Sequence, residues 1–188
     1  IDMAERLGAN VVALRSEWGQ PFPAEMLEDE LRRNENVKLV TVVHAETSTG
    51  IRQPVDDLAK LAKEYDALFM LDAVTSLGGN EVAVDRWDVD YCYSATQKCL
   101  ACPPGLSPVA LSPRAHEVIK ARKNKPSSWD LDLALIATYW GFDHVYHHTA
   151  PVSMVLALRE GLRIVVEEGL EARFERHRRN AAALRDGL

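Results

Sequence analysis

Two kinds of hydrophobic pattern alternate along the first two thirds of the chain. Short apolar runs predict buried strands, and the run over residues 37–43 is also rich in β-branched residues. Stretches with apolar residues every three or four positions predict amphipathic helices. Strands are expected over residues 10–15, 37–43, 67–71, 89–93 and 108–111. Helices are expected over residues 23–33, 54–65 and 114–123. This alternation predicts an α/β fold in which a mostly parallel sheet is flanked by helices.

The last third of the chain has helical patterns only, over residues 131–139, 151–166 and 170–185. We therefore predict a sheet-containing core over residues 1–150 and long helices over residues 151–188 that lead toward a smaller domain. Residues 3–10 resemble the end of a helix, and the last residues are also helical in pattern. These two features predict an internal portion of a longer protein, without its N-terminal segment and its small domain.

Composition and charge exclude several classes of protein. The chain has 188 residues and a formal net charge of −6. No apolar run approaches the roughly 18 residues of a membrane span, and a nucleic-acid binder would need a clustered basic face. The one basic stretch, Arg173 to Arg179, is interrupted by Glu175 and is interpreted as a solvated helix face. Three closely spaced cysteines do not suit a secreted disulfide framework, which favours a cytoplasmic location.

Polar residues follow three of the predicted strands directly. They occupy residues 44–50, 72–79 and 94–98, and they include Asp72 after one strand and Lys98 after the next. In an open parallel sheet, ligands bind outside the carboxyl ends of the strands. A carboxylate, a lysine and several hydroxyl groups at one sheet edge are the parts that a pyridoxal 5′-phosphate site needs.

Each of these residue types suits one task in such a site. The Asp72 carboxylate could stabilise the protonated pyridine nitrogen of the cofactor. Lys98 could hold the cofactor aldehyde as a Schiff base and then move a proton between substrate and cofactor. Thr47 could donate a hydrogen bond to the cofactor's O3′ oxygen. Val74 could pack under the ring, and Gln97 could reach the phosphate.

Five separated segments resemble one known family. They are His44–Gly50 with Gln53-Pro54, Leu71–Gly79, Tyr93–Lys98, Pro103–Gly105 and Val145–Pro151. In this order they resemble the alanine–glyoxylate and serine–glyoxylate (serine–pyruvate) aminotransferases, which are class V pyridoxal phosphate enzymes of fold type I. The resemblance implies the large domain of that fold and the cofactor roles given above for Lys98, Asp72, Val74, Thr47 and Gln97.

The resemblance also implies features that spacing alone does not show. Tyr146 and Thr149 would reach the cofactor phosphate of a partner subunit, so that a homodimer completes the site. The implied reaction is ping-pong transfer of an amino group from alanine or serine to glyoxylate or pyruvate, and with glyoxylate it forms glycine. The family's ring-stacking aromatic, phosphate loop and carboxylate-binding arginine have no counterpart within residues 1–188. This stretch alone is therefore expected to be inactive. Relatives occur in peroxisomes as well as in bacterial cytoplasm, so the resemblance leaves a peroxisomal location open for a eukaryotic protein.

Several alternatives stay open at this point. Other class V reactions are pyridoxamine–pyruvate transamination, phosphoserine transamination and cysteine desulfuration. A CxxC thiol redox module is a rival of a different class, because Cys99 and Cys102 have that spacing. A metal site at His147 and His148 is disfavoured, since neighbouring residues of an extended segment are expected to point to opposite sides and no third ligand is suitably spaced.

Overall fold

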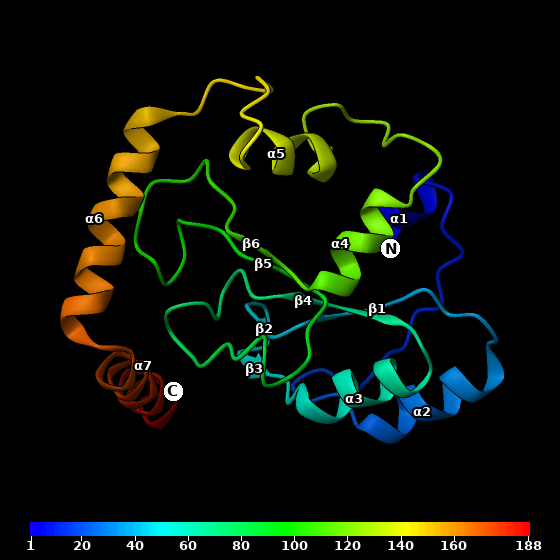
Figure 1. Cartoon of the computed structure of the whole chain (residues 1–188). Coiled ribbons are helices and arrows are strands. Elements are labelled where there is room, and N and C mark those ends of the chain that lie inside the picture. The colour runs from blue at the N-terminus through cyan, green and yellow to red at the C-terminus, as the bar shows by residue number, and fades with distance from the viewer.

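A four-stranded sheet forms the centre of the computed structural model, which describes residues 1–188 (Figure 1). Its strands are β1 (Leu39–Val43), β4 (Leu68–Asp72), β5 (Tyr91–Tyr93) and β6 (Val109–Leu111), in the order β1-β4-β5-β6. The first three run parallel, and β6 pairs antiparallel to β5. A separate short antiparallel pair joins β2 (Ala45–Glu46) to β3 (Ile51–Arg52). The α/β prediction with a mostly parallel sheet is confirmed.

Seven helices accompany the strands. They are α1 (Asp2–Arg6), α2 (Ala24–Arg33), α3 (Asp56–Glu64), α4 (Pro113–Lys120), α5 (Leu133–Trp140), α6 (Val152–Glu168) and α7 (Leu170–Asp186). The bounds of α2 to α7 lie within about three residues of the predicted helices, whereas α1 ends four residues before the predicted segment 3–10 does. None of them has both the length and the apolar character that crossing a bilayer requires.

The predicted strand over residues 10–15 is wrong. This segment is not a strand, and its backbone makes no hydrogen bond to another part of the chain. Only Val11 and Leu14 are partly buried there, and Leu14 packs against the main hydrophobic core. The apolar run therefore supplies contacts to the core without the strand partner that a sheet needs.

The main core lies between the sheet and the helices α2 and α3, which run side by side beneath it in Figure 1. Apolar residues of one helical stripe face the sheet: Leu27 and Leu31 from α2, and Leu58 and Ala62 from α3. They meet the buried side chains of β4, of which Phe69 and Leu71 are almost fully buried. The core thus fixes β4, the strand that ends at Asp72.

A buried carboxylate joins β4, β5 and α4. Asp90 precedes β5, and its Oδ2 accepts a hydrogen bond from the Phe69 amide at 2.9 Å. Its Oδ1 accepts one from the Ser112 hydroxyl at 2.7 Å. Ser112 caps the first turn of α4 through the amide of Ala115, and Pro113 follows it as the first residue of the helix. Asp90 therefore has a structural role at the amino end of β5.

Helices α6 and α7 lie on the opposite side of the molecule from α1 and α2 (Figure 1). They pack against each other, and α7 also reaches the loops at the sheet edge through Arg173. The interpretation of Arg173 to Arg179 as a solvated face is wrong for Arg173, which is only 5 % exposed. The boundary at residue 150 stays a prediction.

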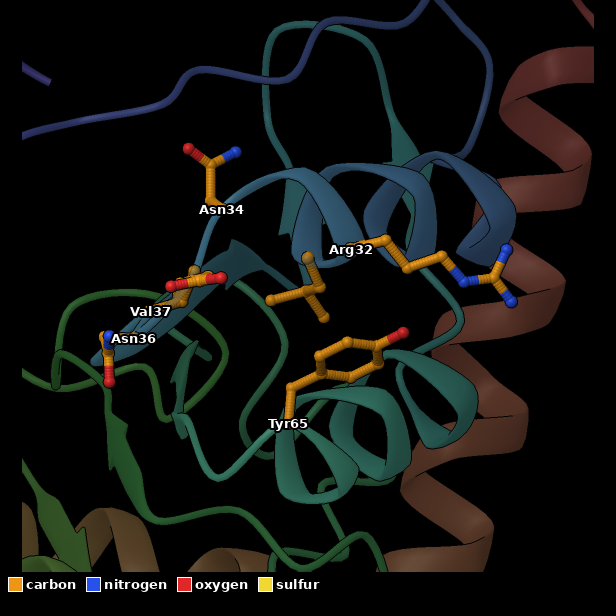
Figure 2. Close-up of a pocket in the computed structure, with 7 residues that line it drawn as sticks. Arg32, Asn34, Asn36, Val37 and Tyr65 are labelled. Atoms are coloured by element: carbon orange, nitrogen blue, oxygen red, sulfur yellow. The ribbon is translucent and has the colours of Figure 1, made fainter.

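Figure 2 shows a cavity of about 490 Å³ at the amino end of β1, between the ends of α2 and α3. Asn34, Asn36 and Val37 line it together with Tyr65, and the Arg32 side chain extends away from the two asparagines. Since Val37 precedes β1, this cavity lies at the edge opposite to the polar strand ends. It has no part in the site described next.

Candidate active site

Asp72 is the last residue of β4, and both of its carboxylate oxygens are held. Oδ1 accepts a hydrogen bond from the backbone N–H of Val74 at 2.9 Å. Oδ2 accepts one from the Tyr93 hydroxyl at 2.6 Å. The side chain is half-buried. Because each carboxylate oxygen can accept a second hydrogen bond, Asp72 can still bind a positively charged donor in a fixed orientation.

Tyr93 is a site residue that the sequence patterns did not identify. The parallel register of β4 and β5 places Tyr93 directly opposite Asp72. Burial is the main cause that raises the pKa of the Tyr93 hydroxyl, and its hydrogen bond to the Asp72 carboxylate raises that pKa further. The hydroxyl therefore remains protonated and serves as a donor to Asp72.

Lys98 lies in the loop between β5 and β6, and its backbone is fixed while its side chain is exposed. The Lys98 carbonyl accepts a hydrogen bond from the Ala101 amide at 2.9 Å. On either side of it, the Thr96 hydroxyl donates to the Pro103 carbonyl at 2.6 Å, and the Cys102 amide donates to the Thr96 carbonyl at 3.0 Å. The amine makes no ion pair or hydrogen bond with the rest of the chain, so it is free to react with a bound molecule.

A cavity of about 960 Å³ lies beside this loop. Lys98 and Thr47 both line it, as do Thr75, Arg52 of β3 and part of α7. The structure thus brings two of the predicted site residues to one cavity. Neither Asp72 nor Val74 lines it, although Thr75 follows them directly.

The remaining predicted site residues lie outside this cavity. Gln97 is exposed beside Lys98. Tyr146 and Thr149 are exposed on the segment between α5 and α6, and their hydroxyl oxygens are 3.0 Å apart. These two hydroxyl groups therefore point to each other, and neither contacts the cavity of its own chain.

Close packing ties the Lys98 loop to the loop that follows Asp72. The Cys99 thiol donates to the Thr75 carbonyl at 3.4 Å. A Cβ atom at Gly79 would lie 2.6 Å from the Cys99 sulfur, which is too close for any side chain. Gly78 has a φ of +85°, a left-handed conformation that favours glycine. The two glycines therefore allow the loop with Lys98 to rest against the loop that follows Asp72.

A third loop joins the same edge through His44, which follows β1 and is almost fully buried. Its Nδ1 lies 2.9 Å from the Ser76 hydroxyl, and its ring meets that of Trp87 edge-on at 5.4 Å between centroids. Nearby, the Thr75 hydroxyl donates to the Ala45 carbonyl. The segment with Thr47 is thus anchored to the loop that follows Asp72.

His44 predicts a dependence of stability on pH. Burial, with a smaller contribution from the charge of Arg52, lowers its pKa to about 4. Between pH 6.5 and pH 4 the unfolded chain therefore binds a proton at His44 that the folded chain binds only weakly. Protonation then favours the unfolded chain, so the stability that the protein has above pH 6.5 decreases as the pH falls. We expect urea unfolding at pH 7 and pH 4.5 to show that His44→Gln loses less stability on acidification than the wild type, by on the order of 2 kcal/mol. An equal loss in both proteins would contradict this expectation.

The cysteines and the paired histidines have local partners. All three cysteines are free thiols. Cys99 donates to Thr75, whereas Cys102 donates to the carbonyls of Leu100 and Ala157. The two thiols thus bind different backbone carbonyls. This arrangement does not support the hypothesis of a CxxC thiol redox module.

The expectation that His147 and His148 point to opposite sides is wrong, because their Nδ1 atoms are 2.8 Å apart. His147 also stacks on Trp129. No group of three or more His, Cys, Asp or Glu side chains in the structure is placed to hold a metal ion.

Comparison with known proteins places this arrangement in a family. The family model described as aminotransferase class-V matches residues 1–188. The (S)-ureidoglycine–glyoxylate transaminase of Bacillus subtilis is 42% identical over 205 residues, which cover 100% of this chain and 49% of that protein. The alanine–glyoxylate aminotransferase of Oryctolagus cuniculus is 40% identical, over 97% of this chain and 47% of that protein.

A solved structure has the same fold over nearly the whole chain. The crystal structure of an alanine–glyoxylate aminotransferase from Nostoc sp. superposes with a TM-score of 0.93 at 44% identity, over 97% of this chain and 48% of that one. The chain thus spans about half the length of the relatives that it matches. Since the family model extends over every residue of the chain, this protein belongs to the class V aminotransferase family.

Proposed function

We propose that the protein binds pyridoxal 5′-phosphate and transfers an amino group from alanine or serine to glyoxylate or pyruvate. The observation that carries this proposal is a carboxylate of fixed orientation at the end of β4 together with an unpaired amine in the loop that follows the neighbouring strand β5. Asp72 is oriented by Val74 and Tyr93, and Lys98 extends from a rigid loop into a cavity that Thr47 also lines. Membership of the class V aminotransferase family supports it.

The residues present fit the cofactor. When bound, pyridoxal phosphate supplies an aldehyde and a protonated pyridine ring that withdraws the electron pair of the substrate's Cα–H bond. Asp72 would stabilise the positive charge on the pyridine nitrogen, because its carboxylate is already fixed by two donors and has further acceptor capacity. The hydrogen bond from Tyr93 keeps Asp72 in that orientation.

Lys98 would hold the aldehyde carbon and would later act on the substrate. Once the amino group of the substrate replaces it, the free amine can take the proton from the substrate Cα and deliver it to the cofactor carbon. The absence of an ion-pair partner leaves this amine available for both tasks. Thr47 would donate to the O3′ oxygen, Val74 would pack against the ring, and Gln97 would contact the phosphate.

A homodimer forms part of the proposal. Tyr146 and Thr149 are exposed and bind only each other, so their hydroxyl groups remain available to a phosphate held by a partner subunit. The surrounding segment exposes large apolar side chains, with Trp129 58 % exposed, Trp140 62 % exposed and Phe142 fully exposed. Several large apolar side chains exposed on one segment are typical of a protein interface. We therefore assign residues 129–149 to the subunit interface.

The names of the relatives agree on the acceptor and differ on the donor. Glyoxylate appears in the name of each of the two curated relatives described above, with alanine in one and (S)-ureidoglycine in the other. A crystal structure of the Bacillus subtilis ureidoglycine–glyoxylate aminotransferase superposes with a TM-score of 0.93 at 45% identity. Ureidoglycine is accordingly the second candidate donor.

The alternatives among class V reactions have weaker support. A pyridoxamine–pyruvate aminotransferase from Mesorhizobium loti superposes with a TM-score of 0.79 at 27% identity. A cysteine desulfurase and a phosphoserine aminotransferase are about 20% identical and share the fold alone. Desulfuration needs a mobile nucleophilic thiol, whereas Cys99 and Cys102 are each tied to backbone carbonyls.

One assay distinguishes these functions. The intact natural protein that carries these residues is supplied with pyridoxal phosphate, glyoxylate and one amino donor at a time, and glycine formation is measured. We expect alanine or serine to support glycine formation. Glycine from ureidoglycine alone would move the assignment to the second candidate. No glycine from any of these donors, together with no alanine from serine when pyruvate replaces glyoxylate, would overturn the proposal.

A further inference from the structure

Arg173 of α7 joins the two loops that carry the proposed chemistry. Its Nε donates to the carbonyl of Gly78 at 2.8 Å, and one terminal nitrogen donates to the carbonyl of Cys99 at 2.5 Å. The other terminal nitrogen pairs with Glu168 at 2.6 Å. The side chain is 7% exposed. A planar guanidinium presents its donors in a rigid fork, so these three acceptors are held in one fixed arrangement.

The two carbonyls belong to the loops that follow β4 and β5. Gly78 lies in the loop that begins after Asp72, and Cys99 is the residue directly after Lys98. The Lys98 carbonyl is already bonded to the amide of Ala101. Arg173 binds the next carbonyl along the chain, that of Cys99, so the two peptide groups that follow Lys98 are both held although its side chain is free.

The charge of Arg173 is compensated within the same cluster. Glu168 accepts hydrogen bonds from Arg173 and Arg176, and these, led by Arg176, lower the pKa of its carboxyl to about 2. The cluster thus remains an ion pair at neutral pH. The buried carbonyl of Gly78 and the partly buried carbonyl of Cys99 would lose their donor if the guanidinium were absent, because nothing else in the structure donates to either of them.

We propose that Arg173 is a positioning residue that sets the Lys98 loop against the loop that follows Asp72. This inference rests on the proposed function of Lys98 and Asp72. Arg173 does not line the cavity, so it acts through the backbone of its neighbours. Small errors in the placement of reacting groups cost rate, and a shift of about 1 Å can cost about 10²-fold.

Arg176 offers a matched control on the same helix. It binds the same Glu168 carboxylate through its Nε and a terminal nitrogen, but it donates no hydrogen bond to either loop. Arg176→Met therefore removes an arginine and its ion pair without loss of a hydrogen bond to a loop. Arg173→Met removes the hydrogen bonds to both loops. Arg173→Lys keeps the positive charge, but its single amine replaces the planar guanidinium.

The test uses the intact natural protein with pyridoxal phosphate bound. Borohydride reduction and mass spectrometry of the peptide with Lys98 give the fraction of Lys98 joined to the cofactor. Steady-state kinetics give kcat and KM for the donor, and urea unfolding gives stability.

We expect Arg173→Met to lower the trapped fraction at Lys98 and to lower kcat by about 10- to 100-fold, with KM changed by less than about threefold. Arg173→Lys should be intermediate. Arg176→Met should unfold at lower urea but keep the trapped fraction, and its kcat should stay within about twofold.

Two results would overturn the inference. One is a folded Arg173→Met or Arg173→Lys with the trapped fraction and kcat of the wild type. The other is an Arg176→Met with the same losses as Arg173→Met, because the effect would then come from stability alone. If Arg173→Met does not fold, the comparison of Arg173→Lys with Arg176→Met decides. A wild type without any label at Lys98 would instead overturn the proposed function, and this inference with it.

Discussion

Replacement of Lys98 with alanine is expected to slow transamination by at least about 10³-fold, because one side chain performs two tasks. Without the amine, the cofactor aldehyde has no covalent anchor on the chain, and no group remains to move the substrate Cα proton. The Lys98 side chain is exposed and unpaired, so its removal should leave folding intact. The measurement is kcat for the donor, together with the visible absorbance of the reconstituted protein.

Lys123→Ala is the matched control. Lys123 is an exposed lysine in the loop after α4 and should leave both kcat and the absorbance unchanged. A small amine added to the solution should restore part of the activity of Lys98→Ala, since it can move the same proton. A Lys98→Ala variant with the spectrum and rate of the wild type would remove this lysine from its assigned role.

Replacement of Asp72 with asparagine is expected to lower kcat by about 10² to 10³-fold. The amide has nearly the same shape, but it carries no charge to stabilise a protonated pyridine nitrogen. Its single oxygen can retain one of the two hydrogen bonds from Val74 and Tyr93. The loss should therefore appear in the rate of the chemical step, measured as kcat, with only a small change in the urea midpoint.

Asp90→Asn gives the opposite pattern and serves as the control. Asp90 is buried and accepts from Phe69 and Ser112 at the amino end of β5, far from the proposed chemistry. Its loss should cost about 1–3 kcal/mol of stability and leave kcat of the folded protein near that of the wild type. Full catalytic rate in Asp72→Asn would contradict the role of the carboxylate.

The hydrophobic pattern predicted most of the helices and strands, because burial of apolar side chains determines where these elements form. The short apolar runs that became β1, β4 and β5 are strands in a sheet covered by helices, where composition and structure agree. Residues 10–15 have a similar composition but no strand beside them, and pairing is a property of the tertiary structure. The antiparallel direction of β6 and the two-residue strands β2 and β3 leave no periodic pattern to detect.

The sequence pattern could locate those candidate site residues that come at or soon after the end of a predicted strand. Asp72 ends β4 and Lys98 lies in the loop after β5, as the pattern predicted, whereas their roles in catalysis remain proposals. Tyr93 could not be identified, because its contact with Asp72 depends on the strand register. Arg173 stands in a charged helical stretch that resembles a solvated face, and only the packing of α7 shows that it is buried.

A crystal structure of the intact natural protein grown with pyridoxal phosphate tests the central claim most directly. We predict continuous density from the Lys98 amine to the cofactor aldehyde carbon, with the pyridine nitrogen about 2.7–3.0 Å from an Asp72 carboxylate oxygen. A cofactor joined to another lysine, or a ring whose nitrogen faces away from Asp72, would contradict the account.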